Sequence, residues 1–206
     1  MAADGSDSST AMHIGSQAEW AQWLAQHHDK SAGVWVRHAR KGAPEASVSH
    51  PEALEVALCF GWIDALKKSA GDHYWAQRWT SRKPGGIWSK VNRDSALRYI
   101  DEGKMQPAGL AAIERARADG RWDAAYEPAS KSGVPPDLQA AFDAHPGAAE
   151  FFATVSAQNR YAVLFRIQTA KKPETRARKI AQFASMLARG ETIYPQGARA
   201  QDSFVP

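Results

Sequence analysis

The chain has 206 residues, of which 44% are hydrophobic, 10% aromatic and 23% charged. These values are ordinary for a globular protein and exclude wholesale disorder, a collagen-like repeat and a long coiled coil. The formal net charge is +4, which permits an anionic partner without requiring one. The count of 8 tryptophans is the one unusual figure.

Both ends of the chain are small and polar, and we expect flexible tails over residues 1–15 and 195–206. Residues 1–15 lack the basic and apolar segments of a secretory signal, and the sequence has no run of about 18 apolar residues, so we expect a cytoplasmic protein without a membrane span. The single cysteine, Cys59, excludes an internal disulfide and a zinc site built on cysteines.

Helix and strand signals alternate from residue 16 onward. Ser16-Gln17-Ala18-Glu19 is a capping box and predicts the start of a helix. Val34-Trp35-Val36 is β-branched and aromatic, which predicts a strand. Ser49-His50-Pro51-Glu52 is a second capping box, and the helix that it opens is expected to end at Gly61.

Two further strands are predicted at Trp62–Leu66 and Tyr74–Thr80, and the turn at Gly71-Asp72 indicates that they form a hairpin. Because side chains alternate along a strand, the second strand should present two different faces. One face carries Trp75, Gln77 and Trp79, and the other carries Tyr74, Ala76, Arg78 and Thr80.

The remaining chain is predicted to be helical. Ser81–Gly86 contains proline and glycine and should form a loop. We expect helices at 92–103 and 107–119, a linker at 127–134, and four more helices within 135–194. The predicted fold class is therefore α+β, with a small antiparallel sheet and helices in residues 16–126 and a helical C-terminal part.

Basic residues gather in two segments of the sequence. Residues 67–93 contain seven basic residues and one acidic residue, a net charge of +6, and residues 166–189 have the same balance. The rest of the chain is net negative. Either segment could face an anionic partner, although a solvated surface that pairs with acidic residues of the fold is the commoner outcome.

The segment Tyr74–Arg93 interleaves aromatic and basic side chains. Aromatic rings stack on flat ligands, cations neutralise anions, and Gly85-Gly86 would let backbone N–H groups approach an anion closely. We predict a site here for an anionic or aromatic small ligand or peptide; the alternative is that the tryptophans belong to the core and the charges form a solvated rim. The predicted site residues are Trp62, Asp64, Arg78, Trp79, Arg82, Lys83, Trp88, Ser89, Lys90, Asn92 and Arg93.

Several single residues allow two interpretations. Asp64 could act as an acid or base, or it could anchor Arg82 or Arg93. Ser89 and Asn92 could bind a ligand or cap the following helix. We expect an inert buried thiol at Cys59. The histidines have no metal-binding spacing, and we predict neither a metal nor a cofactor; they are His13, His27, His28, His38, His50, His73 and His145.

Five segments together resemble the YdeI/OmpD-associated (OmdA, bacteriocin-protection) family. They run in order within about Trp20 to Gly190, and the Cys-Phe-Gly-Trp-Ile-Asp string in the first of them is the most specific. The segments are Glu52–Asp64, Ile87–Arg93, Gly103–Met105, Asp119–Trp122 and Ala170–Ile180. The resemblance implies tolerance of cationic antimicrobial peptides or bacteriocins, and in one family name association with an outer-membrane porin, but it supplies no catalytic residues.

Three functions follow as hypotheses. The first is a cytoplasmic stress-tolerance or peptide-tolerance protein, not an enzyme, that binds an anionic or aromatic ligand. The second is a nucleic-acid-binding protein that joins the two basic segments into one surface, for which the sequence contains no motif. The third is an enzyme in which Asp64 is the acid or base. The oligomeric state stays open.

Overall fold

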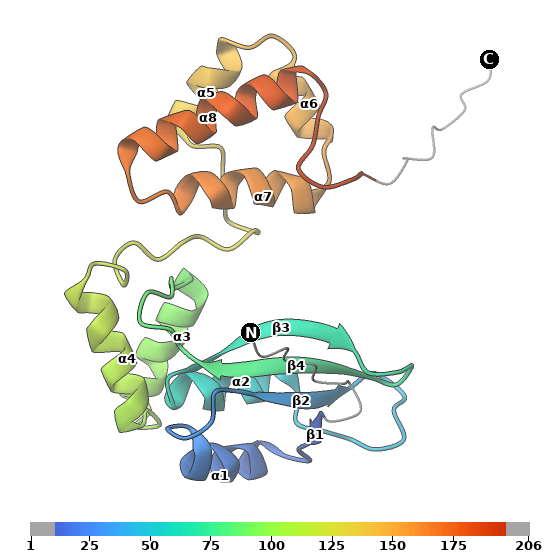
Figure 1. Cartoon of the computed structure of the whole chain (residues 1–206), viewed down its shortest axis with the longest axis vertical. Coiled ribbons are helices and arrows are strands. Elements are labelled where there is room, and N and C mark those ends of the chain that lie inside the picture. Colours follow the sequence, from blue (N-terminus) through green and yellow to red (C-terminus); the bar gives the residue numbers. More distant parts are fainter. Residues whose placement is uncertain (1–10, 197–206) are drawn as a thin grey trace, which may run out of the picture. The chain divides into compact units, whose positions relative to one another are not determined.

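The computed structural model describes residues 11–196, and the chain divides into two compact units, Met1–Ala125 and Tyr126–Pro206 (Figure 1). Each unit has its own hydrophobic core and is described by itself. The fold is α+β, as predicted: unit 1 contains a small sheet and four helices, and unit 2 contains four helices. Most of the two predicted tails falls on residues 1–10 and 197–206, which lie outside the described residues.

Unit 1 is built on a four-stranded sheet with the strand order β1-β2-β4-β3. The strands are β1 Met12–His13, β2 Val34–Ala39, β3 Trp62–Ser69 and β4 Tyr74–Ser81. β3 and β4 form the predicted antiparallel hairpin, and β2 pairs antiparallel with β4. β1 pairs parallel with β2, so the sheet is mixed and not purely antiparallel. A two-residue strand leaves no alternation pattern, which is why the sequence predicts only a tail over residues 1–15.

The sheet has two faces of different composition, because partners in an antiparallel register point to the same side. On the inner face the pairs are Val34 with Trp79, Val36 with Gln77, and His38 with Trp75. The outer face carries Trp35, Arg37, Lys68, Tyr74, Ala76 and Arg78. The alternation predicted for β4 is therefore confirmed.

Helices α1 (Gln17–His27) and α2 (His50–Cys59) pack on the inner face. Both begin at the predicted serines: the side chain of Ser16 accepts from Glu19 N, and Ser49 and Glu52 form a complete capping box. The core between helices and sheet includes Trp20 and Trp79, whose ring centroids lie 6.0 Å apart.

Helices α3 (Lys90–Asp101) and α4 (Pro107–Ala118) complete unit 1 and enclose a second cluster of buried side chains with α2. Their contact with α2 depends on Gly109. A Cβ atom at this position would lie 2.2 Å from the carbonyl oxygen of Cys59, so only glycine allows α4 to approach α2 this closely.

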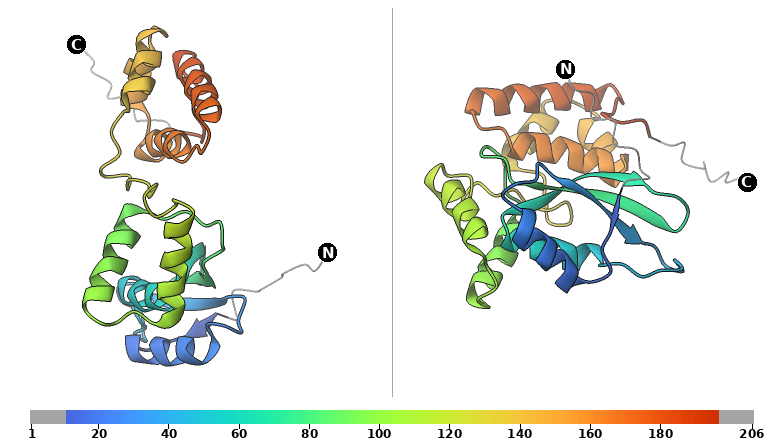
Figure 2. Two further views of the ribbon diagram at one scale, coloured as in Figure 1. Left: turned by 90° about the vertical axis from the view of Figure 1, so that its left-hand side faces the viewer. Right: turned by 60° about the horizontal axis from the view of Figure 1, so that its bottom comes forward.

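Unit 2 consists of α5 (Pro136–Asp143), α6 (Ala148–Thr154), α7 (Ala157–Gln168) and α8 (Pro173–Ala188) (Figure 2). Its core is made of leucine, isoleucine, valine, alanine and phenylalanine side chains. Residues 127–134, the predicted linker, lie at the start of this unit, where Gln168 Oε1 accepts a hydrogen bond from Glu127 N. Among the described helices, none is both long and apolar enough to cross a membrane.

Candidate functional site

The three tryptophans among the predicted site residues lie in the core. Trp62 and Trp79 are 1% and 0% exposed and belong to the cluster under the inner face of the sheet. Trp88 is 2% exposed and belongs to the second cluster, between α2, α3 and α4. A ring this deeply buried has no face to offer a ligand, so these residues follow the core interpretation.

Arg82 is a buried cation that fixes the loop before α3. Its guanidinium carbon lies 3.6 Å from the centroid of the Trp88 ring, and its Nη1 donates to the carbonyl oxygen of Ile87 at 3.4 Å. Trp88 in turn packs edge-on against Trp122, with ring centroids 4.9 Å apart. Arg82 therefore stabilises the packing of unit 1 through a cation–π contact.

The other predicted residues of this loop and of α3 include a helix cap and a local ion pair. Ser89 is the N-cap of α3 and accepts from Asn92 N at 3.1 Å, the structural role that the sequence left as an alternative. Arg93 Nε donates to Asp94 at 3.1 Å. Lys83 is exposed, and Lys90 begins α3.

Asp64 pairs with a histidine that the sequence did not connect to it. His50 Nε2 lies 3.3 Å from Asp64 Oδ2, and this hydrogen bond is the main reason that the pKa of the Asp64 carboxyl falls below its usual value. The positive charge of Arg82 lowers the same pKa further. Asp64 is thus held as a carboxylate paired with His50.

His38 lies beside this pair on the inner face and is 1% exposed. Its Nδ1 must donate to the carbonyl oxygen of Val48, at 2.9 Å, because a carbonyl can only accept. Nε2 is then a buried acceptor with no hydrogen-bond partner in the described part of the chain. Burial is the main cause that lowers the pKa of His38, so its ring is neutral.

Cys59 lines a hollow of about 610 Å³ between α1 and α2 but is itself 5% exposed. Burial raises the pKa of its thiol to about 11, which keeps it protonated and unreactive at neutral pH. At one edge of the hollow, Lys104 Nζ lies 2.8 Å from a carboxylate oxygen of both Glu55 and Glu102. None of the eleven predicted site residues lines this hollow.

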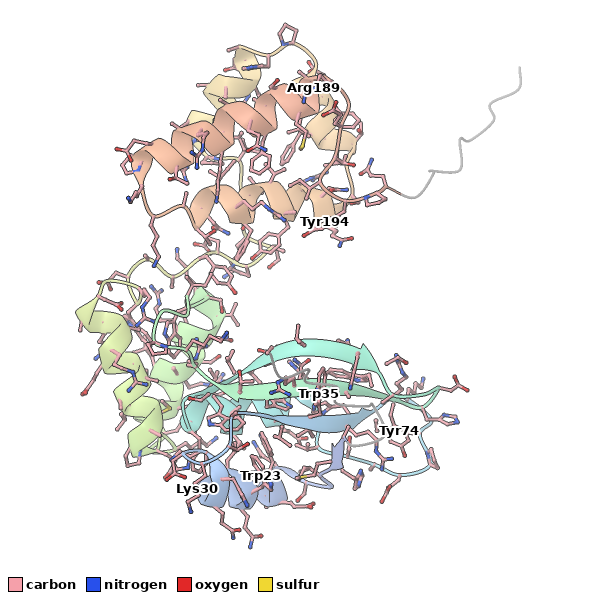
Figure 3. The ribbon with its side chains drawn as sticks, in the orientation of Figure 1. Trp23, Lys30, Trp35, Tyr74, Arg189 and Tyr194 are labelled. Atoms are coloured by element: carbon pink, nitrogen blue, oxygen red, sulfur yellow. The ribbon has the colours of Figure 1, made fainter. Side chains whose placement is uncertain are left out.

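The outer face of the sheet instead gathers aromatic and basic side chains. Its rings include Trp35 and Tyr74, which are labelled in Figure 3. Lys68 Nζ lies 4.2 Å from the centroid of the Trp35 ring, and Arg37 Cζ lies 4.3 Å from that of Tyr74. Arg78, a predicted site residue, is the direct cross-strand neighbour of Trp35. These five side chains are half-buried.

The outer face also carries buried hydrogen-bond donors. Trp35 Nε1 and Arg37 Nε are buried and have no hydrogen-bond partner among the described residues. Glu45 Oε2 accepts from Arg37 Nη2 at 3.1 Å.

The sequence alone does not identify Trp35, Arg37, Lys68 and Tyr74 as members of one surface. All predicted site residues except Trp62 and Asp64 come from the continuous segment Tyr74–Arg93, whereas a sheet face takes every second residue of several strands. The alternation in Val34–Ala39 could have revealed Trp35 and Arg37, but only together with the pairing of β2 to β4.

Two protein-family models match the chain, one within unit 1 and the other within unit 2. Residues 12–112 match a domain of unknown function (DUF8412). This segment includes Glu52–Asp64 and Ile87–Arg93, two of the segments that resemble the YdeI/OmpD-associated family in the sequence. The match to that family's model therefore covers less of the chain than the expected range from about Trp20 to Gly190. No curated protein and no solved structure matches the chain significantly. Residues 132–190, by contrast, match the family model described as Bacteriocin-protection, YdeI or OmpD-Associated.

Proposed function

We propose that unit 1 binds an extended ligand that carries both negative charges and flat rings, and that single-stranded nucleic acid is the class it takes. The observation that supports this is the pairing of cations with aromatic rings on the outer face, Lys68 with Trp35 and Arg37 with Tyr74. Sheet faces of this composition stack bases on the rings while lysine and arginine contact phosphates.

The geometry of the outer face favours an extended ligand over a small one. Trp35 and Tyr74 lie on adjacent antiparallel strands, four positions apart in register, because Trp35 pairs with Arg78. At about 3.4 Å per residue they are some 14 Å apart along the strand, which exceeds the length of a single base. A chain of several nucleotides can reach both rings, and the cations that now cover the rings can move to the phosphates.

The test compares two adjacent lysines on opposite faces of β3. Lys68→Met removes the cation over Trp35 on the outer face, and Lys67→Met removes the matching cation over Trp75, 4.1 Å from its centroid, on the inner face. The measurement is the fluorescence anisotropy of a labelled single strand of about 12 nucleotides, at about 50 mM and about 200 mM salt.

We expect Lys68→Met to weaken binding by about threefold to tenfold and to reduce the salt dependence, as for the loss of one phosphate contact. Lys67→Met should bind like the unchanged protein. Equal losses in the two variants, or no binding of the strand at the lower salt concentration, would contradict the proposal. Preference for an acidic peptide over the oligonucleotide would contradict it as well.

The cellular role that we propose is tolerance of stress or of antimicrobial peptides in the cytoplasm. The description of the family model that matches residues 132–190 supports the tolerance role. The single cysteine, Cys59, fits the reducing environment of the cytoplasm. Expression of the full chain in a bacterium should raise survival in a cationic antimicrobial peptide. Survival equal to that of cells with an empty vector would count against this role.

A further inference from the structure

Unit 2 contains a hollow of about 380 Å³ whose walls are mainly aromatic. It lies along one side of α7 and is closed by residues from before α5 and after α8. The lining residues are Tyr126, Gln158, Tyr161, Ala162, Phe165, Arg166 and Tyr194. None of them belongs to the site proposed in unit 1, so the hollow is an independent feature of the molecule.

The aromatic rings of the hollow pack on one another and still remain partly accessible. Tyr126 meets Phe165 edge-on, with centroids 5.0 Å apart and planes at 88°, and Tyr161 lies 5.7 Å from Phe165. All three side chains are half-buried, and Tyr194 is 38% exposed. A volume of this size within aromatic walls accommodates a ligand of one or two rings.

Hydrogen bonds to the backbone hold the walls in place. The buried Asn159 accepts from Tyr194 N at 2.9 Å and donates to Tyr194 O at 3.0 Å. On the other side, Tyr161 Oη donates to Glu127 O at 3.3 Å, which fixes the segment next to Tyr126. Because both non-helical walls are anchored, little ordering is required when a ligand binds.

Arg166 determines the charge of the ligand. It is the one charged residue among those that line the hollow, and no carboxylate is among them. Its guanidinium donates to Ala162 O at 3.0 Å and to Tyr194 Oη at 3.2 Å. Arginine has five N–H donors, so this group can still bind an anion, whereas it would repel the cation that an aromatic cage otherwise attracts.

We propose that this hollow binds a small aromatic anion of one or two rings with a carboxylate. The rings of the ligand pack against Tyr126, Tyr161 and Phe165, and the carboxylate contacts Arg166. The inference does not depend on the nucleic-acid proposal for unit 1.

The test uses three probes of nearly equal shape on the full chain. They are 2-naphthoate, 2-naphthylmethanol and 2-naphthylmethylammonium, which differ in charge, and binding is measured by isothermal titration calorimetry. We expect the anion to bind about tenfold or more tightly than the alcohol, and the cation to bind weakest, because a charge-assisted hydrogen bond forms with the anion alone. Equal affinities, tighter binding of the cation, or no binding of the anion would overturn the proposal.

Variants locate the binding to the hollow. Arg166→Met should remove the preference for the anion, and Arg166→Lys should keep it in part because the charge remains. Arg178→Met is the matched control, since Arg178 is exposed on α8 and does not line the hollow, and Lys68→Met controls for the outer face. Circular dichroism checks that each variant is folded. Loss of the preference in a folded Arg178→Met or Lys68→Met variant, or its persistence in a folded Arg166→Met variant, would show that the site is elsewhere.

Discussion

The two units bury different kinds of core. All 8 tryptophans of the chain lie in unit 1, whereas the core of unit 2 is aliphatic with phenylalanines such as Phe142, Phe152 and Phe183. In unit 1, α1 and α2 pack on one face of the sheet, and large aromatic rings fill the space between the helices and the sheet. In unit 2 four helices interdigitate smaller side chains. Tryptophan emission therefore reports on unit 1 alone, and the units can be perturbed and measured separately.

The largest effect is expected from Trp79→Ala in unit 1. Trp79 is 0% exposed and contacts the rings of Trp20 and His50, so its loss leaves a large cavity. The free energy of unfolding of unit 1 should fall by about 3–5 kcal/mol. Hydrogen exchange read by mass spectrometry checks this in both units. Peptides from 136–188 should keep their protection, and a parallel loss there would show that the units are one cooperative structure.

Leu138→Ala makes the corresponding change in unit 2. Leu138 is 0% exposed in α5 and lies in the core with Phe142, so truncation should cost about 2–5 kcal/mol in unit 2. Denaturation followed by tryptophan emission should be unchanged, because no tryptophan lies in this unit. A shifted emission transition would break the proposed independence of the two units.

Gly109→Ala should destabilise unit 1, against the usual effect of this substitution in a helix. Helix propensity alone predicts a gain of about 1 kcal/mol. The new Cβ would lie 2.2 Å from Cys59 O, and forcing α4 away from α2 should cost about 1–3 kcal/mol instead. Gly133→Ala in unit 2 is the control, because nothing lies within 4 Å of its Cβ position. Thermal midpoints of both variants decide the sign.

The smallest effect is the pH dependence that His38 gives to unit 1. Its pKa is lower in the folded state, mainly through burial, so the unfolded chain binds the proton more readily. Neutral His38 therefore contributes its full stabilisation of the folded state above about pH 6.5, the ordinary pKa of histidine. As the pH falls below this value, the free energy of unfolding decreases by at most about 1.4 kcal/mol per pH unit. His38→Gln should flatten this slope in denaturation followed by tryptophan emission. If the stability of His38→Gln depended on pH as steeply as that of the unchanged protein, another group would be responsible for the pH dependence.

Local patterns predicted the elements of the fold well because their causes are local. The capping boxes at Ser16 and Ser49 mark the first turns of α1 and α2, and alternation predicted the two faces of β4. The two-residue β1 and its parallel pairing left no such pattern. Its partner, β2, lies more than 20 residues away in the sequence.

The candidate site was harder to predict than the fold. The sequence identified Arg78, which lies on the outer face, but it grouped this residue with Arg82 and Trp88, which form a buried stack. Proximity in the chain suggested that grouping, but β4 ends at Ser81, before Arg82 and Trp88. Likewise, the sequence offered Arg82 and Arg93 as partners of Asp64 in one of its two interpretations and did not point to His50, which the start of α2 brings to it.

The sequence by itself determined which residues alternate, where helices begin, that the chain is α+β, and that its last third is helical. Only the tertiary structure decided which face of the sheet α1 and α2 cover, and therefore which tryptophans are core and which remain half-exposed beside a cation. Alternation along a strand separates two faces but does not say which one is covered, because burial depends on helices that pack from distant parts of the chain. For that reason Trp79 became part of the core and Trp35 part of a surface, although both stand in strands with similar neighbours.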